Sequence, residues 1–86
     1  MKFVEPSHLT DPAVAARKLV EIANAIEPAQ DGNIYIELVN GAFLKGGGTP
    51  DQYCAGIERA IAKGWLSRHE SGTYVTFTLA GAELFA

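Results

Sequence analysis

The stretch GGGTPDQYCAGIERAIAKGWL, residues 46–66, decides the fold, because it holds a turn, a whole helix and the start of a strand. Its three leading glycines first suggest a phosphate-binding loop. A loop of the Walker type requires glycine, four residues and then Gly-Lys-Ser/Thr, and no such lysine follows here. The spaced glycines of a dinucleotide-binding loop are missing as well. The glycines are therefore expected to end one helix and turn the chain toward the next.

The helix after this turn carries start and stop signals. Thr49 is expected to cap it, and Pro50 to occupy its first position, where the missing N–H costs nothing. Gln52 follows Thr49 by three residues, so the pair is expected to form a capping box. Gly64 is expected to end the helix after Lys63. The expected buried stripe is Tyr53, Ile57, Ala60 and Ile61, with Gly56 and Glu58 at the margins of the outer face.

The segment before the glycines, residues 34–44, allows two interpretations. Its first residues are strand-like, and Asn40-Gly41 is a strong hairpin signal. The second arm of such a hairpin would run straight into the glycines. We therefore expect a short strand near Ile34 and then a helix through about Lys45. The residues expected to share one face of this helix are Ile36, Val39, Phe43 and Leu44.

The N-terminal part of the chain predicts another helix. Asp11 can cap it, and Pro12 suits its first position. Pro28 disfavours helical geometry at Glu27, so this helix is expected to end near there. Its apolar residues at helical spacing are Ala15, Leu19, Ile22, Ala23 and Ile26. Residues 1–10 are expected to form an irregular leader, and residues 11–86 a single domain.

The C-terminal part predicts two strands, at residues 65–70 and 73–79, because the second is rich in β-branched and aromatic residues. Between them lies a turn with Gly72 where a left-handed residue can be required. The tail from Thr78 could start a short final helix. Trp65 is expected to pack at the root of this strand pair.

The composition excludes several classes of protein. One cysteine, Cys54, cannot form an internal disulfide, and with two histidines it is too little for a usual zinc site. We expect Cys54 to be semi-buried. No cofactor, metal site or catalytic arrangement is predicted, so we do not expect an enzyme. No apolar run reaches the length of a membrane span, and the start lacks a signal peptide's apolar stretch. A cytoplasmic protein is expected.

Two motifs carry a family resemblance. Residues 57–66, Ile-Glu-Arg-Ala-Ile-Ala-Lys-Gly-Trp-Leu, resemble the run in which the second helix of a helix-turn-helix ends and its wing begins. Residues 74–81, Tyr-Val-Thr-Phe-Thr-Leu-Ala-Gly, are similar to the close of the wing in MarR-like bacterial regulators. The resemblance implies an α+β fold of the winged helix-turn-helix type, with three helices and a small antiparallel wing sheet.

This resemblance implies a DNA-binding transcriptional regulator that works as a homodimer. In the family, the helix after the turn lies in the major groove and the wing touches phosphate or minor groove. Gln52 could then pair with adenine and Arg59 with guanine, because each offers two hydrogen-bonding groups to a base edge. The full set of nucleic-acid-binding candidates is Lys45, Thr49, Gln52, Arg59, Lys63, Arg68 and His69.

The charge pattern supports an alternative. Net charge is −3, and the segment from Ile34 to Gly72 is neutral, whereas affinity for DNA comes largely from cations that meet phosphates. The site residues also have structural interpretations, since Gln52 can serve only the capping box and Lys63 suits a helix C-terminus. The alternative is a winged-helix module that binds a protein partner and no DNA. Double-stranded DNA and a protein thus both remain candidate partners.

Overall fold

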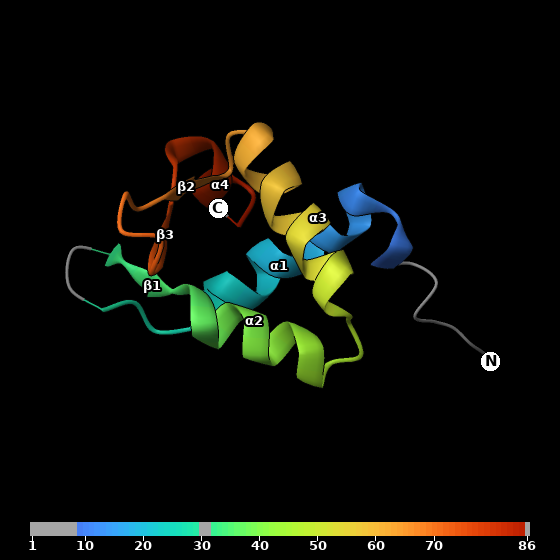
Figure 1. Ribbon diagram of the computed structural model, residues 1–86. Helices are drawn as coiled ribbons and strands as arrows, with labels where there is room; N and C mark the ends of the chain where they lie inside the picture. Colours follow the sequence, from blue (N-terminus) through green and yellow to red (C-terminus); the bar gives the residue numbers. More distant parts are fainter. Residues whose placement is uncertain (1–8, 30–31, 86) are drawn as a thin grey trace.

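The computed structural model describes residues 9–29 and 32–85. Residues 1–8 of the expected leader lie outside the described residues. The described chain is an α+β fold of four helices and one three-stranded antiparallel sheet. In chain order the elements are α1 (Pro12–Ala25), β1 (Ile34–Tyr35), α2 (Ile36–Lys45), α3 (Pro50–Ala62), β2 (Leu66–Arg68), β3 (Tyr74–Phe77) and α4 (Leu79–Glu83). The three longer helices gather on one side of the molecule, and the small sheet lies beside them (Figure 1).

Helix α1 begins where the sequence predicts. The Asp11 carboxylate accepts a hydrogen bond of 2.9 Å from the backbone N–H of Ala13, and Pro12 follows the cap. The helix ends at Ala25, close to the expected position, and the next residue is already extended. The residues of its buried face are Ala15, Ala16, Leu19, Val20 and Ala23. Ala16 and Val20 were not in the expected stripe, whereas Ile22 and Ile26 of that stripe are only half-buried.

The expected short strand and helix are confirmed for residues 34–45, and Asn40-Gly41 lies inside α2 instead of in a hairpin. Val39 and Phe43 are buried, as expected. The prediction that Leu44 joins this face is wrong, because its side chain is 36% exposed. One residue step rotates an α-helix by about 100°, so the neighbour of a buried residue can face solvent.

The glycines between α2 and α3 turn the chain as predicted. Gly46 donates its N–H to the carbonyl of Ala42 and so closes α2, and Gly47 has a φ of +104°, which a side chain would disfavour. A Cβ at Gly48 would lie 2.2 Å from Cε2 of Phe43. Glycine is therefore favoured at position 47 by backbone conformation and at position 48 by packing against the buried Phe43 ring.

Helix α3 confirms the capping box. Thr49 Oγ1 accepts from the N–H of Gln52 at 3.2 Å, and Gln52 Oε1 accepts from the N–H of Thr49 at 3.0 Å. Tyr53, Ile57 and Ala60 are buried as predicted, while Ile61 is half-buried. The placement of Gly56 at the margin of the outer face is wrong, because it is buried against Ala15 and Leu19 of α1.

The strands are shorter than predicted, and the three-helix count is wrong. Residues 69–73 form the turn between β2 and β3, and the sheet order is β1-β3-β2. Strand β3 ends before Thr78, whose hydroxyl accepts from the N–H of Gly81 at 3.0 Å and so caps a fourth helix, α4. The same hydroxyl donates to the carbonyl of Gly64. This contact fastens the start of α4 to the end of α3.

Gly64 stops α3 with a φ of +79°, in the left-handed region, and Gly72 has a φ of +78° in the turn between β2 and β3. A Cβ at Gly64 would meet no atom within 4 Å, so a substitution there is strained by the backbone alone. We expect Gly64→Val to lower the free energy of unfolding by about 1–2 kcal/mol. Gly64→Asn should cost clearly less, because asparagine tolerates this conformation. Urea denaturation compares the three proteins, and equal stabilities would contradict this account of the helix end.

Candidate nucleic-acid interface

The predicted binding residues are distributed along the end of α2, the whole of α3, the end of β2 and the turn that follows it. Lys45 is the last residue of α2, and Thr49 is the N-cap of α3. Arg59 lies in the last turn of α3, and Lys63 is its C-cap. Arg68 ends β2, and His69 begins the turn that follows. Six of the seven residues are exposed, and the seventh, Gln52, is half-buried.

The cations of this surface are not held in ion pairs. Within residues 9–29 and 32–85 the salt bridge is Arg17 to Glu21, on α1, with 3.6 Å between Nε and Oε2. Lys63 instead places its Nζ 5.9 Å from the ring centroid of Trp65, a cation–π contact. Trp65 packs against the core at the wing root, as expected. No ion pair among the described residues would therefore have to break before an anion binds to Lys45, Arg59 or Arg68.

The outer face of α3 is mixed in charge. Ala55 and Ala62 are exposed on it and leave the helix surface smooth. Asp51 and Glu58 are exposed as well, so the face carries carboxylates beside its cations. Cys54 is also exposed, and the prediction that it is semi-buried is wrong. It follows the buried Tyr53, and the step of about 100° per residue carries it to the outside.

The capping box restricts what Thr49 and Gln52 can offer. The Thr49 hydroxyl and one lone pair of Gln52 Oε1 already accept backbone hydrogen bonds. A two-pronged pairing with adenine requires Oε1 to accept from the base and Nε2 to donate to it. Gln52 can meet that requirement only through the second lone pair of Oε1. Its capping role is therefore established, whereas its base-reading role stays a prediction.

His69 has a structural role in the turn between β2 and β3. Its Nδ1 accepts from the N–H of Ser71 at 3.1 Å and lies 2.8 Å from Ser71 Oγ, which in turn accepts from the N–H of Thr73. The imidazole ring also meets the ring of Tyr74 edge-on, with centroids 5.5 Å apart. With Nδ1 engaged inside the turn, Nε2 is the nitrogen available to a partner.

Two tyrosines near this surface were not singled out by the sequence. Tyr35 of β1 pairs in register with Tyr74 of β3, and their ring centroids lie 4.8 Å apart. The side-chain hydrogen bond with Tyr35 raises the pKa of Tyr74. These residues are 39 positions apart in the chain, so only the strand pairing, which the sequence does not give, could have joined them.

Tyr53 is a buried residue of the first turn of α3, and its ring centroid lies 6.1 Å from that of Phe43 of α2. Its side chain is buried, and its hydroxyl has no hydrogen-bond partner. Burial raises the pKa of Tyr53, and the positive charge of Arg68 opposes part of this rise.

In the part of the chain that the structure describes, no group of three or more His, Cys, Asp or Glu residues could hold a metal ion. None of the helices in the same residues is long and apolar enough to cross a membrane. No protein-family model, curated protein or solved structure matches the chain significantly. The resemblance to winged-helix regulators therefore stays a prediction, based on the motifs and the arrangement of α2, α3 and the wing.

Proposed function

We propose that this chain is a small cytoplasmic winged-helix protein that binds double-stranded DNA and regulates transcription as a homodimer. The order of the elements, helix, strand, helix, helix, strand, strand, supports this proposal, as does the sheet order β1-β3-β2. In the proposed complex α3 enters the major groove, and the turn after β2 contacts the phosphate backbone.

The observation that carries the proposal is the set of free cations around α3. Lys45, Arg59 and Arg68 are exposed, come from three different elements and form no ion pair among the described residues. A cation without an internal partner loses no interaction when it replaces the counterions of a phosphate. The small side chains of Ala55 and Ala62 also let the α3 backbone approach the groove closely. These features together suit a helix that lies between two phosphate strands.

Fluorescence anisotropy of a labelled, random-sequence duplex tests the proposal. We expect non-specific binding with a dissociation constant of about 10⁻⁴ to 10⁻⁶ M at physiological salt, and tighter binding at low salt. With Lys63 added, four cations can neutralise phosphates, so the slope of log K against log salt should be no steeper than about −4 per subunit. Absence of binding by the folded protein at low salt would contradict the proposal.

Arg59→Ala is the variant that locates the binding surface. We expect it to weaken duplex binding about 3- to 10-fold and to flatten the salt slope by about 1, because one phosphate or base contact is lost. Lys18→Ala is the matched control, since Lys18 is an exposed cation on α1. Its affinity and slope should match the wild type. Equal losses in both variants would show that only net charge matters.

A second function is favoured by the carboxylates on the same surface. Asp51 and Glu58 are exposed on α3, and Glu70 is exposed in the wing turn. They oppose phosphate binding and suit a protein partner that presents both charges. The exposed Cys54 gives a direct test, because a photo-crosslinker attached there reports what touches α3. A defined partner captured from Cys54, and not from a cysteine placed at position 18 in a Cys54→Ser background, would favour this function over DNA binding.

A further inference from the structure

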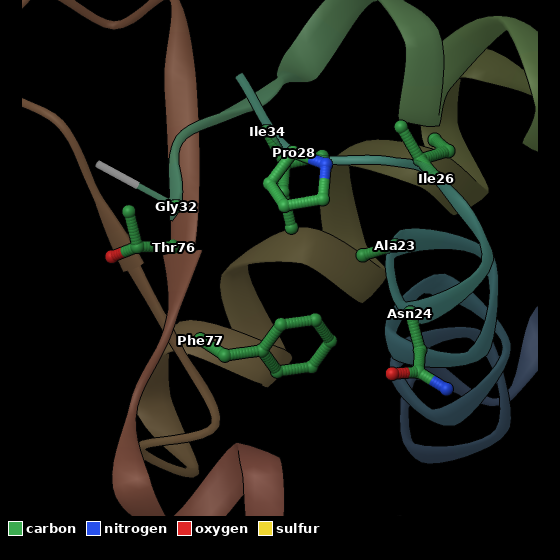
Figure 2. Close-up of a pocket in the computed structure, with 8 residues that line it drawn as sticks. All are labelled: Ala23, Asn24, Ile26, Pro28, Gly32, Ile34, Thr76 and Phe77. Atoms are coloured by element: carbon green, nitrogen blue, oxygen red, sulfur yellow. The ribbon is translucent and has the colours of Figure 1, made fainter. Parts of the chain in front are cut away.

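A pocket of about 310 Å³ lies between the end of α1 and the sheet, away from the predicted DNA-binding residues. Its lining comes from α1, the connector after it, β1 and β3 (Figure 2). The lining residues are Ala23, Asn24, Ile26, Pro28, Gly32, Ile34, Thr76 and Phe77. The volume is at the lower end of the range of about 300–1,000 Å³ that small-molecule sites occupy, which suits a ligand built on a single ring.

The main apolar wall of the pocket is fixed in place. The ring of Phe77 reaches from β3 toward α1, and Pro28 and Ile34 lie across the opening from it (Figure 2). Phe77 also contacts the ring of Phe85 edge-on, with centroids 6.0 Å apart. The guanidinium of Arg17 lies 5.8 Å from the Phe85 centroid and covers that ring in turn. An aromatic ligand would therefore meet a ring already held in position, at a small cost in ordering.

The chemistry of the lining selects against ions. None of the eight lining residues, all within the described part of the chain, carries a charge. A charged ligand would lose part of its hydration here and find no opposite charge among the lining residues. Asn24 lies on the lining and is exposed, and its amide can both donate and accept a hydrogen bond. We propose that the pocket binds a small, uncharged aromatic molecule that carries one hydroxyl or amide group.

This inference does not depend on DNA binding. NMR titration of the ¹⁵N-labelled chain tests it with three small aromatic probes that have similar shapes and different charges. Benzyl alcohol is neutral, benzoate is an anion and benzylamine is a cation at pH 7. We expect saturable shifts of the amides of Asn24, Ile34 and Phe77 with benzyl alcohol, with a dissociation constant of about 1–10 mM. The two ions should bind at least about tenfold more weakly. No saturation with benzyl alcohol, or equal binding of all three probes, would overturn the proposal.

Two tryptophan variants test the location of the binding site: one fills the pocket, and the other is its matched control. Asn24→Trp places a large ring at the mouth of the pocket from an exposed position of α1, whereas Ala25→Trp places the same ring on the next exposed residue, which does not line the pocket. We expect Asn24→Trp to lose benzyl alcohol binding and Ala25→Trp to retain it. Nuclear Overhauser contacts between the probe and the Phe77 ring in the wild type give a second readout, independent of either variant. Their absence under saturating probe would also overturn the proposal.

Discussion

We expect Gly81→Val to lower the free energy of unfolding by about 2–4 kcal/mol, the largest loss among the substitutions considered. Gly81 is buried in α4, and a Cβ there would lie 2.0 Å from the carbonyl oxygen of Trp65 and 2.8 Å from its carbonyl carbon. That oxygen already accepts the N–H of Thr78 at 3.1 Å. Since the obstacle is backbone, no side-chain rotation can relieve it, and α4 must shift away from the sheet.

Ala82→Val is the matched control for this prediction. Ala82 is the next residue of the same helix and is exposed, so valine there meets no such obstacle. It should cost only about 0.5 kcal/mol, through its lower helix propensity. Urea denaturation followed by circular dichroism measures both proteins. A Gly81→Val protein as stable as the Ala82→Val protein would contradict the packing of α4 on Trp65.

The second large effect is expected at the crossing of α1 and α3. A Cβ at Gly56 would lie 2.8 Å from Leu19 Cδ1, 2.9 Å from Ala15 Cβ and 3.1 Å from the Ala15 carbonyl carbon. We expect Gly56→Val to lower the free energy of unfolding by about 2–3 kcal/mol. The Leu19 side chain can rotate away, but the backbone of Ala15 cannot, so the two helices must separate. The loss should be somewhat smaller than at Gly81, because part of the obstacle is a flexible side chain.

Gly41→Ala tests the opposite case on α2. Gly41 is exposed inside the helix, and a Cβ there would have no atom within 4 Å. Alanine should therefore stabilise the protein, by about 0.5–1 kcal/mol, because it is the better helix former. Thermal unfolding of the Gly41 and Gly56 variants gives shifts of opposite sign in this account. Destabilisation by Gly41→Ala would show that α2 is packed differently.

The features that the sequence predicted correctly depend on short-range chemistry. The Asp11 cap, the capping box of Thr49 and Gln52, and the end of α3 at Gly64 are each decided by a few neighbouring residues. The errors concern contacts between distant parts of the chain. Gly56 is buried because α1 crosses α3 there, and no local pattern contains that crossing.

The fourth helix shows the same limit. It has five residues, and its Thr78 cap also contacts Gly64, fourteen positions earlier in the chain. A helix this short depends on tertiary contacts more than on propensity. Its start could be suggested from the sequence, but its presence as a packed element could not.

For the candidate site, the sequence identifies the residue types but not the ion pairs and hydrogen bonds that their side chains form. It supplies Arg59 and Arg68 as cations, and the structure adds that neither is in an ion pair among the described residues. It suggests two roles for Gln52, and the structure establishes the capping role. Pairing of side chains depends on three-dimensional position, and this is why the choice between DNA and a protein partner requires a binding experiment.

The most direct test of the proposed function is an NMR footprint of duplex DNA on the ¹⁵N-labelled protein at low salt. We expect amide shifts concentrated in residues 49–63 and 68–72, on α3 and the wing turn, with α1 unchanged around Lys18. They should fade as salt is raised, since counterion release drives this binding. Shifts confined to α1, or none at all at low salt, would contradict the proposal that α3 and the wing form a DNA-binding surface.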